Sequence, residues 1–242
     1  MKTILITGAT SGIGKATYLY LREKGYRCVI IGRDQKKLDE LGQNDANTIL
    51  INFNLLNLDN IGIIFQKIQS LRIKLDGLVH CAGLSPLMLT KENDINVMKE
   101  TFEVNLFSFI ELLKFFQDAN VSNINSSIVA ISSVAGEFSS YRQTVYGASK
   151  AGLEQAVRCM AKELMQQGIR VNCVAPGAVQ TEMLTELQTK SNSLKEKLES
   201  IYPLGIIPVE KVAEQIEYLL SSKSKYMTGT IMQMDAGYFS WK

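Results

Sequence analysis

The sequence lacks an excess of charge of either sign: 26 Lys and Arg residues stand against 24 Asp and Glu residues, a formal net charge of +2. Such an even balance gives no electrostatic reason to expect nucleic acid as a partner. No apolar run approaches the roughly 20 residues needed to span a membrane. Residues 1–7 pass directly into a strand pattern, so we expect no signal peptide and a cytoplasmic location.

Cysteine and histidine are scarce. The four cysteines, Cys28, Cys81, Cys159 and Cys173, are scattered, mostly within apolar runs, and show no metal-ligand spacing. We therefore expect no metal site, and reduced, buried thiols. His80 is the single histidine.

What the sequence does contain is a regular alternation of short β-rich runs and longer helical patterns, which is typical of βαβ units and a parallel sheet. Most of the β-rich runs are continuously apolar, as for strands covered on both faces. Strands are predicted at 3–7, 27–31, 48–53, 77–80, 127–132, 170–175 and 230–234. Helices are predicted at about 13–24, 35–42, 58–72, 95–119, 144–167 and 209–222.

The chain contains no linker or repeat, so we expect a single α/β domain over 1–242, with helices on both faces of a seven-stranded parallel sheet. The segment 177–207 is polar and rich in lysine. Because an irregular stretch of this length inside a compact domain usually has a function, we expect it to close over a substrate.

Residues 7–14, TGATSGIG, follow the first predicted strand and open the first predicted helix. Glycines allow a tight turn, close approach of a ligand and close packing of helix on strand. The free N–H groups and the positive end of the helix dipole favour a pyrophosphate. This position after strand one predicts nucleotide binding rather than a plain turn. The expected contacts are Gly8, Thr10, Ser11, Gly12, Ile13 and Gly14.

The second predicted strand suggests which nucleotide is bound. Gly32 lies 18 residues after Gly14, close to the place where an acidic residue bonds a ribose 2′-hydroxyl in dinucleotide folds, whereas an Arg accommodates a 2′-phosphate. Arg33 follows Gly32, and Asp34 is better explained as the N-cap of a helix starting at Gln35. NADP(H) is therefore favoured over NAD(H), with an ordinary surface charge as the alternative reading of Arg33.

Tyr146 and Lys150 share one helix face at positions i and i+4. A neighbouring ammonium stabilises a phenolate and lowers its pKa from the usual value of about 10. That suits Tyr146 to exchange a proton with a carbonyl or alcohol oxygen. The spacing alone also fits a solvated helix surface.

With Asn105 and Ser133, these motifs resemble the short, single-domain type of the short-chain dehydrogenase/reductase family, most closely its 3-oxoacyl-[acyl-carrier-protein] reductase members. The resemblance runs from Lys2 to about Phe239 and includes Gly83 and the runs 132–136, 171–177 and 227–230. It implies a single doubly wound Rossmann domain that binds NAD(P) and transfers hydride.

The resemblance also implies catalytic roles. Tyr146 would be the general acid in carbonyl reduction, and Lys150 would lower its pKa and bond the nicotinamide ribose. Ser133 would bond the substrate oxygen. Ser132 is the alternative by adjacency, but it is expected to face the other side of the strand end. Asn105 would kink its helix and hold a water of the proton relay.

Further cofactor contacts implied by the resemblance follow strands three, four and six, at Asn54, Leu55, Ala82, Gly83, Pro176, Gly177, Val179 and Thr181. Pro176 and Gly177 would lie against the nicotinamide ring, and Thr181 would bond its carboxamide.

The chain departs from the family pattern in two places near the site. His80 and Cys81 stand where the family has two asparagines. We expect His80 to be structural, bonding nearby backbone, and Cys81 to be a small packed side chain. Asn54 stands where the family has an Asp that contacts adenine, so the carbonyl acceptor remains and the charge is lost.

A carrier-protein partner requires basic surface near the cleft. The segments 119–125 and 165–168 carry no positive charge, so acyl carrier protein is a possible but not a favoured partner. Lys190, Lys195 and Lys197 are the alternative basic group. Met183, Leu184 and Leu187 could form an apolar cover over the substrate or pack a helix on the core.

These observations predict an NADPH-dependent reductase of a ketone, either a 3-oxoacyl group or a small carbonyl compound. The first alternative is an alcohol dehydrogenase of a sterol, polyol or sugar. The second is a nucleotide-sensing regulator without turnover, which is less favoured because the chain keeps all four catalytic positions. By resemblance, helices 95–119 and 144–167 would pair copies into a homotetramer or homodimer.

Overall fold

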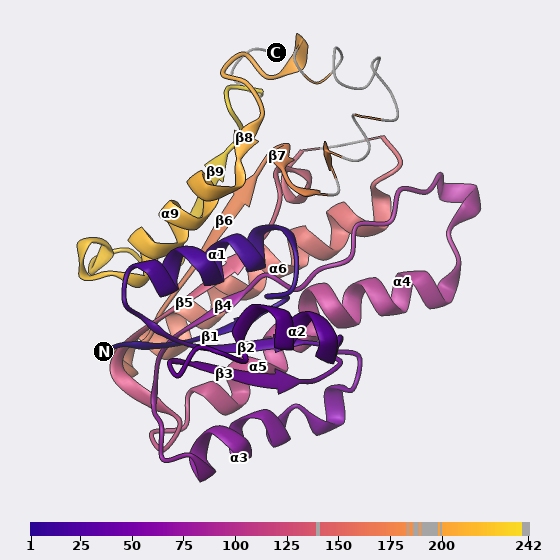
Figure 1. The fold of residues 1–242 in the computed structure, drawn as a ribbon. Coiled ribbons are helices and arrows are strands. Elements are labelled where there is room, and N and C mark those ends of the chain that lie inside the picture. Colours follow the sequence, from indigo (N-terminus) through magenta and orange to yellow (C-terminus); the bar gives the residue numbers. More distant parts are fainter. Residues whose placement is uncertain (139–140, 183, 186–188, 190–197, 199, 239–242) are drawn as a thin grey trace.

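The computed structural model describes residues 1–138, 141–182, 184–185, 189, 198 and 200–238. Its main sheet has seven strands in the order β3-β2-β1-β4-β5-β6-β9, and every neighbouring pair is parallel (Figure 1). The strands are β1 (Thr3–Thr7), β2 (Arg27–Gly32), β3 (Thr48–Asn52), β4 (Leu75–His80), β5 (Ser122–Ile131), β6 (Arg170–Pro176) and β9 (Ile231–Met234). The chain runs outward from β1 to β3 and then crosses back to β4, which confirms the doubly wound sheet.

Helices cover both faces of this sheet (Figure 1). One face carries α3 (Gly62–Ser70), α5 (Ser108–Phe116) and α6 (Thr144–Leu164), and the other carries α1 (Gly12–Glu23), α2 (Gln35–Gly42) and α9 (Val209–Leu220). Because side chains alternate along a strand, Leu5 packs in the first layer and Ile4 and Ile6 in the second. Each such buried side chain contributes about 1.5–3 kcal/mol to folding.

The helix predicted at 95–119 is interrupted. The structure divides it into α4 (Ile95–Phe102), a π-helical turn (Glu103–Phe107) and α5. Asn105 lies in the π-helical turn and bonds groups outside its own helix, and local helical periodicity contains no signal for such contacts. The helix predicted at 58–72 likewise begins with a 3₁₀ turn (Leu58–Asn60) before α3.

Strand β5 begins at Ser122 rather than at 127, because Ser122 pairs with Leu75 of β4 before a shift in register. The described part of segment 177–207 contains a separate parallel pair, β7 (Val179–Gln180) with β8 (Ile207–Pro208). The predicted contributions of Met183, Leu187, Lys190, Lys195 and Lys197 fall outside the described residues. Over the part that is described, no helix has both the length and the apolar character to cross a membrane.

Candidate active site

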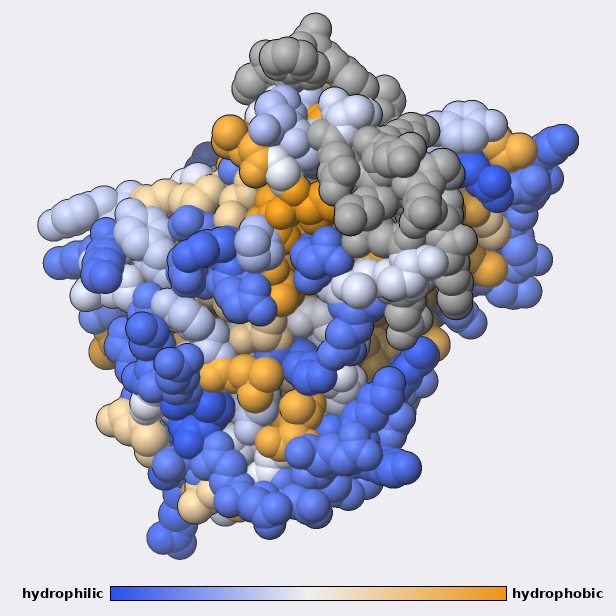
Figure 2. Space-filling view, turned by 45° about the horizontal axis from the view of Figure 1, so that its top comes forward, coloured by the Kyte–Doolittle hydropathy of each residue, from blue (hydrophilic) through white to orange (hydrophobic). Residues whose placement is uncertain are grey.

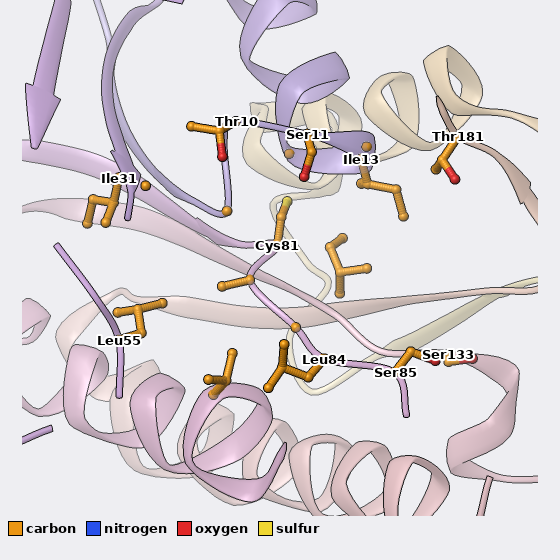
Figure 3. A pocket seen from close by; sticks show the side chains of 18 of the residues that line it. Thr10, Ser11, Ile13, Ile31, Leu55, Cys81, Leu84, Ser85, Ser133 and Thr181 are labelled. Atoms are coloured by element: carbon orange, nitrogen blue, oxygen red, sulfur yellow. The ribbon is translucent and has the colours of Figure 1, made fainter. Parts of the chain in front are cut away.

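A cavity of about 690 Å³ lies at the carboxyl ends of the parallel strands, beside the point where the strand order reverses between β1 and β4. Figure 3 shows Ile31 and Leu55 at one end, Ser133 and Ser85 at the other, and Cys81 between them. Figure 2 shows a mostly hydrophilic surface with hydrophobic side chains gathered along its middle.

Every residue predicted to contact a cofactor lines this cavity: Gly8, Thr10, Ser11, Gly12, Ile13, Gly14, Arg33, Asn54, Leu55, Ala82, Gly83, Tyr146, Lys150, Pro176, Gly177, Val179 and Thr181. Ser133 lines it too, whereas Asn105 is fully buried behind it. Sequence reasoning missed Glu100 and Val104, which reach the wall from the α4 side and carry no motif.

The Gly-rich turn has the geometry of a phosphate cradle. Gly8 and Gly12 adopt positive φ angles of 64° and 50°, a region that favours glycine. A Cβ atom on Gly14 would lie 2.2 Å from the carbonyl oxygen of Gly8, so helix α1 starts tightly against the turn. Ser11 caps α1 without a side-chain hydrogen bond, and the helix dipole favours an anion there. This turn therefore suits the pyrophosphate of a dinucleotide.

At the end of β2 the structure leaves little room for an acidic side chain. A Cβ on Gly32 would lie 2.6 Å from Thr10 Cγ2. The carboxylate of Asp34 accepts a 3.2 Å hydrogen bond from the backbone N–H of Lys37, which confirms Asp34 as the N-cap of α2. The exposed side chain of Arg33, directly after β2, is thus the charged group at this end of the cavity.

Helix α6 brings Tyr146 and Lys150 into the opposite end of the cavity. Burial raises the pKa of Tyr146 above its ordinary value, and a hydrogen bond with the Ser133 side chain partly opposes that rise. The net direction is opposite to the lowering that the sequence led us to expect. A raised pKa keeps the phenol protonated at neutral pH, which is the form that can donate a proton.

Lys150 is also buried at this end of the cavity. Its ammonium group lies 5.8 Å from the centre of the Tyr146 ring and donates a 2.7 Å hydrogen bond to the carbonyl oxygen of Ile131. The side chain is buried, and burial lowers the pKa of Lys150 to about 8. Burial is the largest cause of the pKa direction in both groups.

Asn105 connects three segments behind the cavity. Its side-chain amide donates to the Leu84 carbonyl at 2.9 Å and to the Ser149 hydroxyl at 2.8 Å, and its oxygen accepts from the Leu84 N–H at 2.7 Å. The π-helical turn thereby joins the segment after β4 to helix α6, one residue before Lys150.

His80 and Cys81 occupy the positions where the family has asparagines. His80 is fully buried and contacts Thr7 and the carbonyl oxygen of Val104. Burial, with a smaller effect of Lys150, lowers the pKa of His80 to about 3, so the ring is neutral and structural as predicted. Cys81 lines the cavity, and burial raises the pKa of its thiol to about 12. Among the described residues, no cluster of three or more His, Cys, Asp or Glu side chains is suited to a metal ion.

Comparison with known proteins identifies the family. A family model described as Enoyl-(Acyl carrier protein) reductase matches residues 8–239. The 3-oxoacyl-[acyl-carrier-protein] reductase FabG of Thermotoga maritima is 34% identical over 248 residues, covering 98% of this chain and 97% of the relative. The chain belongs to the short-chain dehydrogenase/reductase family. It is an NAD(P)-dependent oxidoreductase, as the sequence predicted.

Other members of the family resemble the chain over nearly its whole length. Carbonyl reductase family member 4 of Xenopus laevis is 31% identical and covers 98% of this chain and 97% of the relative. Among solved structures, 4-hydroxyisoleucine dehydrogenase complexed with NADH has a TM-score of 0.93 at 27% identity, covering 100% of both chains. ElxO with NADP bound has a TM-score of 0.90 at 26% identity and covers 99% of each. The chain is therefore similar both to a structure with NADH bound and to one with NADP bound.

Proposed function

We propose that the protein reduces a ketone, a 3-oxoacyl group or a small carbonyl compound, to a secondary alcohol at the expense of NADPH. The observation that carries this proposal is one continuous cavity. It joins the glycine cradle and Arg33 at one end to Ser133, Tyr146 and Lys150 at the other. The cradle supports a dinucleotide, and the second group supports proton transfer to an oxygen beside it.

The preference for NADPH is supported by the end of β2. An acidic side chain at position 32 would collide with Thr10, and Asp34 is occupied as a helix cap. The guanidinium of Arg33 suits a 2′-phosphate, which it can bond in a bidentate, charge-assisted way. Neither position 32 nor Asp34 therefore offers a free carboxylate to a ribose 2′-hydroxyl.

In the proposed reaction, bound NADPH supplies a hydride to the carbonyl carbon. Tyr146 donates its phenolic proton to the carbonyl oxygen as negative charge develops there. Ser133 donates a hydrogen bond to the same oxygen and so stabilises that charge. Lys150 holds the nicotinamide ribose, and Asn105 keeps the region behind Lys150 aligned for reprotonation of Tyr146.

The class of ketone is supported by the relatives and by charge. The FabG relative is named for a 3-oxoacyl substrate on acyl carrier protein. In this chain, however, the turn Met165–Gln167 at the end of α6 carries no positive charge to meet an acidic carrier. We therefore favour a 3-oxoacyl thioester or small ketone that is not attached to a carrier protein.

A second candidate is the oxidation of a secondary alcohol with NAD(H). It is favoured by the similarity to the complex of 4-hydroxyisoleucine dehydrogenase with NADH. The same residues would act in reverse, with Tyr146 accepting the proton. The raised pKa of Tyr146 opposes this direction at neutral pH, because the phenol must first lose its proton.

A substrate panel tests the proposal. Small ketones and 3-oxoacyl thioesters, free and carrier-linked, are assayed with NADPH and with NADH, together with secondary alcohols in the oxidative direction. Turnover of free ketones or thioesters with NADPH is the expected result. Nucleotide binding without any turnover would favour a nucleotide-sensing regulator instead.

We further propose that residues 1–242 form one folding unit that assembles into a homotetramer or homodimer. Phe107 is 44% and Ile110 36% exposed on segment 95–119, one of the two expected to pair, and apolar side chains left exposed in this way favour association. Light scattering would give the mass of the assembly, and a monomer would contradict the proposal.

A further inference from the structure

His80 lies where three segments meet behind the cavity. One ring nitrogen, Nδ1, lies 3.0 Å from the Thr7 hydroxyl at the end of β1, directly before the Gly-rich turn. The other, Nε2, lies 3.3 Å from the carbonyl oxygen of Val104 in the π-helical turn. His80 is the last residue of β4, and its side chain is fully buried. A single side chain therefore touches the nucleotide-binding turn and the turn that carries Asn105.

The hydrogen bonds determine which nitrogen carries the proton. A carbonyl oxygen only accepts, so Nε2 of His80 must be the donor to Val104. Since the neutral ring has one N–H, Nδ1 is the acceptor, and the Thr7 hydroxyl donates to it. The oxygen of Thr7 in turn accepts the backbone N–H of Ala82 at 3.2 Å. The four groups form one directed chain with each hydrogen accounted for.

The π-helical turn creates the acceptor at Val104. The backbone N–H of Ser108 bonds the carbonyl of Glu103, five residues back, instead of that of Val104, four residues back. The Val104 carbonyl accepts instead from the Ser108 hydroxyl at 2.7 Å and from His80. His80 thus bonds a carbonyl released by the same local change in helix geometry that positions Asn105.

We propose that His80 is a positioning residue, which as its neutral Nε2–H form ties the nucleotide-binding turn, through Thr7, to the π-helical turn that holds Asn105. This inference rests on the proposed function for the role of Asn105. An asparagine at this position can keep part of the linkage, because its amide also offers a donor and an acceptor. A leucine fills the space and offers neither.

The alternative is that His80 only packs. Its ring lies 5.5 Å from that of Phe109, and a purely packing role would be filled by any apolar side chain of similar volume. The two roles are separated by comparing His80→Asn with His80→Leu. Thr101→Val is a matched control, since it removes another buried hydrogen bond, from Thr101 to the Val97 carbonyl, in the adjoining helix α4.

The first experiment observes the ring directly. Because His80 is the only histidine, histidine labelled with ¹⁵N gives one pair of ring signals that needs no assignment. We expect a protonated Nε2, an unprotonated Nδ1, and no change between pH 5 and 8. An Nδ1–H form, or titration near pH 6.5, would overturn the proposal whether or not a substrate has been found.

The second experiment measures the linkage. Hydrogen exchange of the peptide around the Glu103–Phe107 turn should become faster in His80→Leu and remain close to wild type in His80→Asn and Thr101→Val. In turnover, His80→Leu should lower kcat about tenfold, as for one lost hydrogen bond, with little change in the KM for NADPH. Equal protection and equal kcat in both His80 variants would show that the residue only packs. If the wild type shows no turnover and exchange is still faster in His80→Leu than in the wild type, the proposed reaction is contradicted and the linkage is supported.

Discussion

The hydroxyl of Ser132 donates a 2.8 Å hydrogen bond to the carboxyl group of Glu154, which is only 3% exposed. Burial raises the pKa of that carboxyl group. Both serines line the cavity, so the expectation that Ser132 faces away from it is wrong, but their hydroxyl groups differ: that of Ser132 is engaged with Glu154 of helix α6, and that of Ser133 contacts Tyr146. Two adjacent serines thus have different surroundings, and they should have different functions.

Replacement of each serine by alanine should separate these functions. Ser133→Ala should lower kcat by about 10²–10³, as for loss of one donor to a developing oxyanion, and leave NADPH affinity unchanged. Ser132→Ala should retain most of the activity but lower the free energy of unfolding by about 1–3 kcal/mol, because it leaves a buried carboxyl group without its donor. Steady-state kinetics and urea unfolding measure both; a larger kinetic loss in Ser132→Ala would reverse the assignment.

Tyr146→Phe should lower kcat for ketone reduction by about 10²–10⁴, the usual contribution of a general acid. The ring remains, so cofactor affinity measured by nucleotide fluorescence should change little. Tyr141→Phe is the control, since Tyr141 is exposed, precedes α6 and is not among the residues that line the cavity. Activity close to wild type in Tyr146→Phe would show that another group supplies the proton.

Arg33→Gln should weaken NADPH binding about 10- to 100-fold and leave NADH binding nearly unchanged, because a charge-assisted hydrogen bond contributes about 1.5–3 kcal/mol. Lys36→Gln removes the same charge from the nearby helix α2, outside the residues that line the cavity. It should leave both affinities close to wild type. Equal weakening by the two variants would reduce the role of Arg33 to general electrostatics.

Lys150 predicts the alkaline limit of activity. Burial lowers its pKa to about 8, so the ammonium is present below that pH and is lost as the pH rises through it. Because kcat/KM for NADPH reports groups of the free enzyme, it should fall above about pH 8. Lys150→Arg, which stays charged, should move this limit to higher pH while lowering the maximum rate. A profile without any fall up to pH 10 would contradict the prediction.

His80 predicts an acid sensitivity of folding. Its pKa is about 3 in the folded protein and 6.5 in an ordinary environment, so unfolding takes up a proton between these values and stability falls as the pH is lowered from 6.5. From pH 7 to pH 5 the wild type should lose about 2 kcal/mol more than His80→Asn, provided that both unfold in two states. Urea titrations at the two pH values give the difference, and equal losses would contradict it.

The sequence was sufficient to predict the sheet and the residues around the cavity. Apolar runs and turn glycines are local signals for the strands and the Gly-rich turn, and parallel strands carry their carboxyl ends to one edge. The family resemblance added Asn54, Gly83 and Pro176, which line the cavity at that edge. The N-cap at Asp34 followed from the same local rules and is confirmed.

Helix periodicity, in contrast, did not predict the break at Glu103–Phe107, although the family resemblance implied a kink at Asn105. The π-helical turn depends on bonds from Asn105 to Leu84 and Ser149, and these partners lie 21 and 44 residues away in the chain.

The sequence by itself determined where the strands lie along the chain, where the phosphate cradle forms, and that Tyr146 and Lys150 share one helix face. Each of these depends on neighbours within a few residues. Only the tertiary structure decided the pKa direction of Tyr146, the engagement of Ser132 with Glu154, and the proton on His80. Desolvation and hydrogen bonding of a buried group are sums over atoms brought together from distant segments, and no spacing along the chain contains that sum.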